Sequence, residues 1–275
     1  MEKTLVVSDL DGTLLTSKAE LSPFTTAALT DLIGRGMCFT VATARTPVSA
    51  MKLLGALPLR VPLVMMNGVL LYDPATGVNL HAELLDEQSV AEIRRALRSA
   101  GVSAFHYRVN ERDLTVFHEP LHEPLSIAFH QQRLWMGHFR EVPSLDDVPA
   151  GQTGYISMLG SYDMLLPVRD ALAGHGEIGH VFYRDVYTEG LWFLELFSAR
   201  VSKQTAVERV TALCGAGHVI AFGDNLNDIP LFRAGNECYA VANARDELKA
   251  MAHGVIGGND EDGVARWLLD HWKTK

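Results

Sequence analysis

Residues 4–13 read TLVVSDLDGT, and this stretch decides the fold. Its first half, Thr4 to Ser8, is short, apolar and rich in β-branched residues, which predicts a strand buried on both faces of a parallel sheet. Asp9 and Asp11 follow at once, and Gly12 permits a tight turn there. Because ligands bind at the carboxyl ends of strands in open α/β sheets, we expect a ligand site beside these two carboxylates.

The segments that follow alternate between helical and extended patterns. Ser22 and Pro23 form a favourable helix start, and apolar residues recur at helical spacing up to Gly34. A strand, a helix and a strand are then expected at 37–42, 48–57 and 61–66. The pattern returns near the end of the chain, with helices expected at 202–214, 228–234, 245–252 and 262–272 and strands at 218–222, 238–241 and 255–256. These two regions predict one α/β core, a Rossmann-like doubly wound parallel sheet.

The middle of the chain lacks this rhythm and predicts an inserted unit. A helical period covers 86–100, extended runs cover 102–109 and 113–118, and a helix at 167–173 and a strand at 180–186 follow. Such a mixture is typical of an α+β domain. We therefore expect a core of residues 1–80 and 190–275 and a cap of residues 81–189, with the run around Trp192 returning to the core sheet.

The composition is that of an ordinary globular protein. The chain has 275 residues, 48% hydrophobic and 21% charged, which is enough to bury a sizeable core. Its formal charge of −9 disfavours non-specific binding to nucleic acid or to an anionic membrane. We find no signal-peptide pattern, no apolar stretch long enough to span a bilayer and only three widely spaced cysteines. A cytoplasmic protein is therefore expected, as a monomer or a homodimer.

A second acidic motif, GDNLND at 223–228, follows the strand expected at 218–222. Asp224 and Asp228 are four residues apart and can line one loop-to-helix turn, where Asn225 and Asn227 add uncharged oxygens. These residue types are also common in helix N-cap loops. However, neighbouring carboxylates repel each other unless a cation lies between them, and Mg²⁺ prefers oxygen ligands. Two acidic loops at strand ends of one sheet therefore predict a Mg²⁺ site.

Two further residues are suited to binding a phosphate group. Thr43 stands between an expected strand and helix, where a hydroxyl and backbone N–H groups can bind an anion. Lys203 stands at the start of an expected helix, where a cation opposes the helix dipole, and this indicates a role other than helix stability. The structural alternatives are a helix cap for Thr43 and a solvated surface lysine for Lys203.

These residues together resemble the haloacid dehalogenase-like hydrolases, in the Cof-type branch of small-molecule phosphatases with a large inserted cap. The resemblance covers the whole core and rests on DLDGT at 9–13, Thr43, Lys203 and GDNLND at 223–228, in that order. The chain departs from the usual pattern at two positions, since Ala44 and Gln204 stand where the family usually has glycine. We expect a slight backbone adjustment at Ala44 and no loss of charge at Lys203.

The resemblance implies catalytic and metal-binding roles. Asp9 would be the nucleophile that forms an aspartyl-phosphate. Asp11 would be the general acid for the leaving alcohol and then the base for water. The Mg²⁺ ligands would be Asp9, the backbone carbonyl of Asp11 and Asp224, with Asp228 as a ligand-orienting or water-mediated partner.

The resemblance also implies a substrate class. Thr43 and Lys203 would hold the phosphoryl oxygens, while Asn67 and Asn227 would touch the phosphate or the substrate. The chain would be a Mg²⁺-dependent phosphatase of small phosphorylated metabolites such as sugar phosphates, pyridoxal phosphate or nucleotide-type phosphates. The cap would close over the site, exclude water and select the leaving group.

Three alternatives stay open. A phosphotransferase or phosphomutase on the same scaffold would transfer the phosphoryl group to a second hydroxyl compound. A non-catalytic phosphometabolite-binding protein is expected to lack Asp9 or Asp11, and both are present. Residues 118–122, HEPLH, match the zinc-hydrolase pattern HExxH, but Pro120 would break the helix that this pattern requires. The other cap histidines are expected in packing or at the surface rather than as ligands: His106, His130 and His138.

Overall fold

The structure is a computed structural model that describes residues 3–112, 114–185 and 188–272. The chain divides into two compact units. One consists of the residues up to Leu80 together with those from Ser202 onward, and the other is His81–Val201. None of the helices in these described ranges has the length and apolar character needed to cross a membrane.

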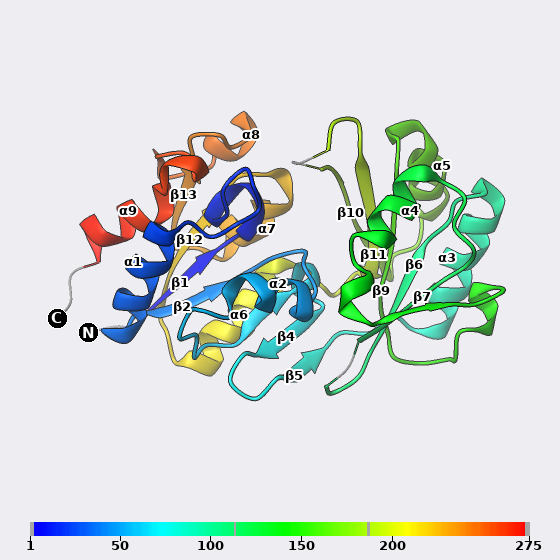
Figure 1. The fold of residues 1–275 in the computed structure, drawn as a ribbon, viewed down its shortest axis with the longest axis horizontal. Helices are drawn as coiled ribbons and strands as arrows, with labels where there is room; N and C mark the ends of the chain where they lie inside the picture. Colours follow the sequence, from blue (N-terminus) through cyan, green and yellow to red (C-terminus); the bar gives the residue numbers. More distant parts are fainter. Residues whose placement is uncertain (1–2, 113, 186–187, 273–275) are drawn as a thin grey trace. The chain divides into compact units, whose positions relative to one another are not determined.

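The first unit is built on a five-stranded parallel sheet of order β14-β13-β12-β1-β2. The strands are β1 (Thr4–Ser8), β2 (Cys38–Val41), β12 (His218–Gly223), β13 (Glu237–Val241) and β14 (Gly254–Ile256). β1 lies between β2 and β12 (Figure 1), and Leu5, Val6 and Val7 have no exposed surface, as expected for a strand covered on both faces. Ser8 stands opposite both Phe222 and Val41, so the three strands end at one edge of the sheet.

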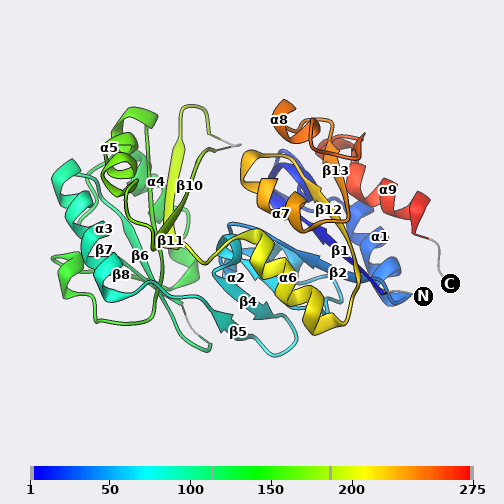
Figure 2. The same cartoon turned by 180° about the vertical axis from the view of Figure 1, so that it is seen from behind.

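Helices cover both faces of this sheet. Figure 2 shows α6 (Lys203–Cys214) and α7 (Ile229–Ala234) in front of the sheet and α1 (Pro23–Gly34) behind it. α1 packs with α9 (Gly263–His271), and two shorter helices, α2 (Pro47–Leu54) and α8 (Asp246–Lys249), complete the unit. This confirms the doubly wound core.

The strand expected at 61–66 differs from the expectation. It forms as β3 (Leu63–Met65) and touches the parallel sheet through an isolated bridge between Ala42 and Val64. Its ladder partner is β4 (Leu70–Asp73), which runs antiparallel to it, and β5 (Val78–Ala82) completes a separate three-stranded sheet. The chain reverses at Asn67 and Gly68, where both φ angles are positive.

The second unit confirms the inserted α+β domain. Its mixed sheet has the order β10-β11-β9-β6-β7-β8. The strands are β6 (Phe105–Val109), β7 (Leu114–His118), β8 (Phe139–Glu141), β9 (Thr153–Gly160), β10 (Ile178–Arg184) and β11 (Trp192–Ser198). The helices are α3 (Glu87–Ala100), α4 (Pro124–Gln131) and α5 (Tyr162–Leu172), and α3 and α5 bury a common apolar core against the sheet. Two expected strands extend onto Asp113 and Val186, which lie outside the described residues.

The assignment of the run around Trp192 to the core sheet is wrong. β11 pairs antiparallel with both β9 and β10, and its Leu194 and Leu196 belong to the apolar core of the second unit. The second unit therefore ends at Val201 rather than at residue 189. A run of apolar residues predicts a strand, but it does not predict the sheet in which that strand pairs.

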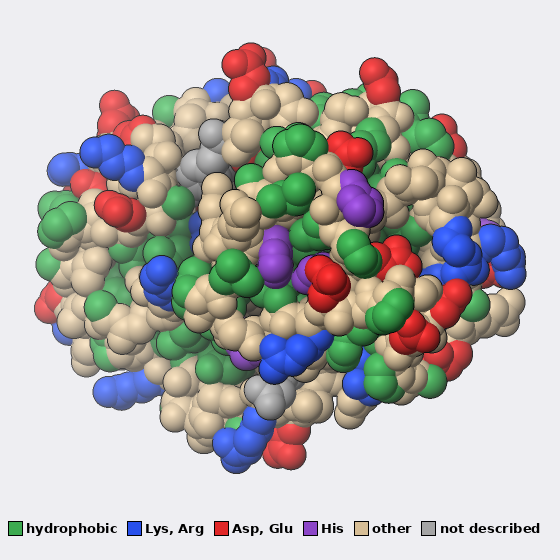
Figure 3. Space-filling view, turned by 45° about the vertical axis from the view of Figure 1, so that its right-hand side comes forward, with side chains coloured by type: hydrophobic (Ala, Val, Ile, Leu, Met, Phe, Trp, Pro, Cys, Tyr) green, Lys and Arg blue, Asp and Glu red, His purple; other side chains and the backbone are tan. Residues whose placement is uncertain are grey.

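The HEPLH segment is not a helical metal motif. His118 ends β7, and α4 begins only at Pro124, so His118 and His122 do not share a helix face. His106 is fully buried, and its Nε2 lies 2.8 Å from Thr153 Oγ1. The ring of His130 packs against His118 and Phe139. Figure 3 shows histidine side chains at the surface, beside hydrophobic and acidic ones.

Candidate active site

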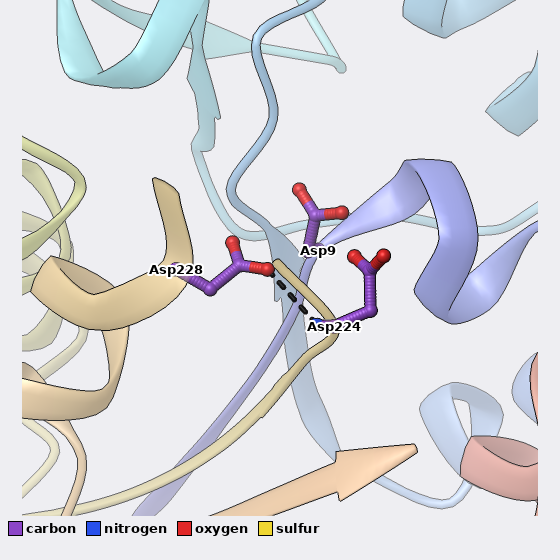
Figure 4. A group of neighbouring side chains, drawn as sticks. All are labelled: Asp9, Asp224 and Asp228. Carbon is purple, nitrogen blue, oxygen red and sulfur yellow. Dashed lines mark hydrogen bonds between the residues drawn. The ribbon is translucent and has the colours of Figure 1, made fainter. Parts of the chain in front are cut away.

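Three carboxylates meet where β1 and β12 end. Asp9 follows β1, Asp224 follows β12, and Asp228 ends the short turn Leu226–Asp228. One carboxylate oxygen of each lies within 4.8 Å of the others, and all three residues are buried. Figure 4 shows the three carboxyl groups side by side. The parallel register brings them together, since the backbone N–H of Asp9 donates to the carbonyl of Phe222 at 3.0 Å.

Asp228 organises its own loop as well as the cluster. Its Oδ2 accepts hydrogen bonds from the backbone N–H groups of Asp224, at 3.0 Å, and Asn225, at 3.1 Å. A side chain at Gly223 would collide with it, because an added Cβ would lie 2.8 Å from Asp228 Cβ. This geometry suits a residue that orients a neighbouring ligand.

Lys203 supplies a buried positive charge. Its Nζ donates to Asp9 Oδ1 and to Asp228 Oδ1, both at 2.7 Å, and the residue is 2% exposed. The alternative of a solvated surface lysine is therefore wrong. Burial by itself would lower the pKa of Lys203, but Asp228 and then Asp9 raise it above its ordinary value, so the ammonium group stays charged. Gln204 does not disturb it and pairs with Glu208.

The cluster holds more negative charge than its surroundings balance. Burial, followed by the charge of Asp228, raises the pKa of Asp9 to about 7 against the lowering effect of Lys203. Burial and the charge of Asp228 also raise the pKa of Asp224. Three ionised carboxylates beside one ammonium group carry a net negative charge, which an additional cation would balance. Hard oxygen donors at this spacing fit a Mg²⁺ ion, so the residues present suit the expected metal.

The carboxyl group of Asp11 is not part of this cluster. Arg45 binds both of its oxygens, with Nε donating to Oδ2 at 2.7 Å and Nη2 donating to Oδ1 at 2.6 Å. Arg45 Nη1 also donates to Ser49 Oγ at 3.3 Å. The side chain of Asp11 is thus held by a rigid, two-point ion pair, whereas its backbone belongs to the loop beside Asp9.

The other candidate residues lie in neighbouring loops. Thr43 is buried, and its Oγ1 accepts from the Arg45 N–H at 3.1 Å. It is not the cap of α2, because Thr46 fills that position. Asn67 is also buried, has a φ of 56°, and donates its backbone N–H to the Thr43 carbonyl at 2.9 Å. Asn227 is half-buried in the same turn as Asp228.

Sequence reasoning missed the contacts of three further residues, although Gly12 and Thr13 belong to the motif that it singled out. Arg45 stands two residues after Thr43, but nothing in the local sequence indicates that its guanidinium reaches Asp11. Thr13 Oγ1 donates to Asp224 Oδ1 at 3.1 Å, which links the two acidic loops directly. Gly12 has a φ of 81°, and an added Cβ would lie 2.9 Å from Asp224 Cγ, so this position needs glycine for both conformation and space.

The chain is similar to known proteins over nearly its whole length. A family model described as haloacid dehalogenase-like hydrolase matches residues 6–268. A pyridoxal phosphate phosphatase of Escherichia coli is 28% identical over 98% of this chain and 99% of its own. A 5-amino-6-(5-phospho-D-ribitylamino)uracil phosphatase of Bacillus subtilis is 26% identical over 96% of both chains. A haloacid dehalogenase-like hydrolase structure from Bacteroides thetaiotaomicron superposes with a TM-score of 0.81, at 23% identity, over 98% of this chain and 99% of that one.

Proposed function

Because the chain belongs to the haloacid dehalogenase-like hydrolases, we propose that it is a Mg²⁺-dependent phosphatase that hydrolyses small phosphorylated metabolites through an aspartyl-phosphate on Asp9. One observation carries the proposal: Asp9 is buried beside Asp224 and Asp228 and is paired with the buried Lys203. The relatives support the substrate class, since two of them are named as phosphatases of pyridoxal phosphate and of 5-amino-6-(5-phospho-D-ribitylamino)uracil.

The proposed first step is attack by an Asp9 carboxylate oxygen on phosphorus. A bond forms between that oxygen and phosphorus while the bond to the leaving oxygen breaks. Both partners are anionic, so the attack needs positive charge nearby. The Lys203 ammonium supplies one such charge at Asp9. Asp9, Asp224 and the backbone carbonyl of Asp11 would hold Mg²⁺, which supplies further positive charge to the phosphoryl oxygens.

Asp11 would be the general acid and base. It gives one to the leaving alcohol in the first step and takes one from the attacking water in the second, which releases phosphate and restores the Asp9 carboxylate. Because Arg45 occupies both Asp11 oxygens, this role requires at least one of those two hydrogen bonds to open. Thr43 and Asn67 would contact the phosphoryl group from the loops after β2 and β3.

Replacement of Asp9 by asparagine tests the proposal. Asp9→Asn keeps the size of the side chain but removes the nucleophile, so hydrolysis of an aryl phosphate in Mg²⁺ should fall at least ~10³-fold. Chelation should stop the wild-type enzyme, and added Mg²⁺ should restart it. Acid-quenched wild-type reactions should carry a phosphoryl group on the Asp9 peptide, measured by mass spectrometry.

The matched control is Asp31→Asn, since Asp31 forms an exposed ion pair with Arg35. This variant should hydrolyse at the wild-type rate. Retained turnover in Asp9→Asn would contradict the nucleophile assignment. Turnover that depends on an added alcohol acceptor would point to phosphoryl transfer instead.

A further inference from the structure

We propose that Asn243 and its partner Asn259 position the loop that carries Asp9 and Asp11, and thereby act as positioning residues for the reaction proposed above. Asn243 follows β13, the neighbour of β12 in the sheet. Asn259 begins the short 3-10 helix Asn259–Glu261, which follows Gly257 and Gly258. Neither residue belongs to the carboxylate cluster.

A continuous set of hydrogen bonds joins these residues to the catalytic loop. Asn243 Nδ2 donates to the Gly12 carbonyl at 2.7 Å. Asn243 Oδ1 accepts from the backbone N–H of Asn259 at 3.0 Å. Asn259 Nδ2 in turn donates to the Leu15 carbonyl at 2.9 Å. Gly12 and Leu15, at the two ends of the loop after Asp11, are therefore held by two asparagines that are bonded to each other.

The turn after β13, which carries Asn243, also holds the second acidic loop. Two residues after Asn243, the backbone N–H of Arg245 donates to the carbonyl of Asp224 at 2.8 Å. On the inner side, Thr13 Oγ1 donates to Asp224 Oδ1, and Gly12 packs directly against that side chain. The turn after β13 thus fixes the Gly12–Thr13 peptide and Asp224 relative to each other.

The Asn243 amide makes both hydrogen bonds because it carries a donor and an acceptor. The Gly12 carbonyl requires a donor, and the Asn259 N–H requires an acceptor, which fixes the orientation of the amide. Aspartate has the same shape but carries two acceptors. Asn243→Asp would keep the bond from Asn259 and replace the donation to Gly12 with a repulsive contact between oxygens.

The substitution is informative because Asn243 is exposed. Its replacement removes little packing, and water can reach the groups that it leaves, so the stability of the protein should change little. The position of the Gly12 peptide should change more, and a displacement of about 1 Å near reacting groups can lower a rate by ~10²-fold. A residue that merely supports the fold would show the opposite pattern.

The experiment compares Asn243→Asp, Asn243→Gln and Asn236→Asp. Asn236→Asp is the matched control, since Asn236 is exposed at the other end of β13 and its Oδ1 accepts from Val219 N–H, a bond that aspartate can keep. For an aryl phosphate with Mg²⁺, Asn243→Asp should lower kcat by about tenfold or more with a much smaller change in KM. Asn243→Gln, which keeps the amide, should recover part of the loss, and Asn236→Asp should match the wild type.

A second measurement does not depend on activity. In the free protein, amide hydrogen exchange at residues 10–15 should be about tenfold faster in Asn243→Asp than in the wild type, while exchange in β1 stays unchanged. Unchanged exchange in the loop, or faster exchange with an unchanged kcat, would overturn the proposal. If the wild type hydrolyses no phosphate ester, the proposed function is wrong, and so is the catalytic role of the hydrogen bond from Asn243 to Gly12. The exchange measurement still decides whether Asn243 holds the loop.

Discussion

Removal of the Lys203 charge should destabilise the core strongly. Lys203 Nζ lies 2.7 Å from both Asp9 and Asp228, and the three side chains are 1%, 7% and 0% exposed. Lys203→Met fills a similar volume but leaves both carboxylates buried without their cation. Breaking a buried ion pair in this way costs about 3–5 kcal/mol, because the remaining charge can neither reach water nor find a partner.

The loss should depend on pH. The pKa of Asp9 already lies at about 7, and Lys203 lowers it. Without the ammonium group this pKa would rise further, so the Asp9 carboxyl group would stay protonated to higher pH. Protonation removes one of the stranded charges, so Lys203→Met should lose less free energy of unfolding at pH 5 than at pH 8. Urea denaturation without divalent ions, followed by circular dichroism, measures both values.

The matched control for this prediction is Lys249→Met. Lys249 Nζ lies 3.8 Å from Asp246, whose side chain is 99% exposed, so this pair should contribute less than about 0.5 kcal/mol. If Lys203→Met unfolds within about 1 kcal/mol of the wild type at pH 8, the reasoning about a buried counter-charge is refuted.

Two further predictions concern the metal. Because bound Mg²⁺ needs ionised carboxylates and the pKa of Asp9 is about 7, the apparent association constant should rise by up to about tenfold per pH unit between pH 5 and 7 and then level. Calorimetry in two buffers of different ionisation enthalpy measures the released proton, and an affinity independent of pH would contradict the cluster. Gly12→Ala should lose about 1–2 kcal/mol to backbone strain and also weaken Mg²⁺ binding by displacing Asp224. Gly36→Ala, with a φ of 98° and open space around its Cβ position, should lose stability alone, so equal Mg²⁺ affinities in the two variants would refute the displacement.

The core of the fold and the centre of the site could be predicted because their signals are local. β1 and β12 are short apolar runs, and each is followed at once by its acidic loop. Adjacent parallel strands end at one edge of a sheet, so the meeting of Asp9 and Asp224 follows from topology. Lys203 stood out because its position opposes the helix dipole, and its burial between two carboxylates explains why a lysine occurs there.

The features that escaped prediction depend on partners far away in the sequence. β9 is buried along its whole length, but its residues TGYISMLG have neither a continuous apolar run nor a clean alternation. β11 had a clear strand pattern, yet its sheet is chosen by β9 and β10. The pairing of Asp11 with Arg45 and the tether from Asn243 to Gly12 join residues 34 and 231 positions apart, and no local pattern specifies either contact.

The place of β1 in the sheet governs the order in which the nascent chain can fold. One edge of β1 pairs with β2, which starts at Cys38, but the other edge waits for β12, which starts only at His218. By then His81–Val201 has left the ribosome and can already be compact. Pairing between such distant segments is slow, so the edge of β1 that later pairs with β12 stays open to aggregation in the meantime. The cluster of Asp9, Asp224 and Asp228 cannot form before Asp228 is made and β12 has paired with β1.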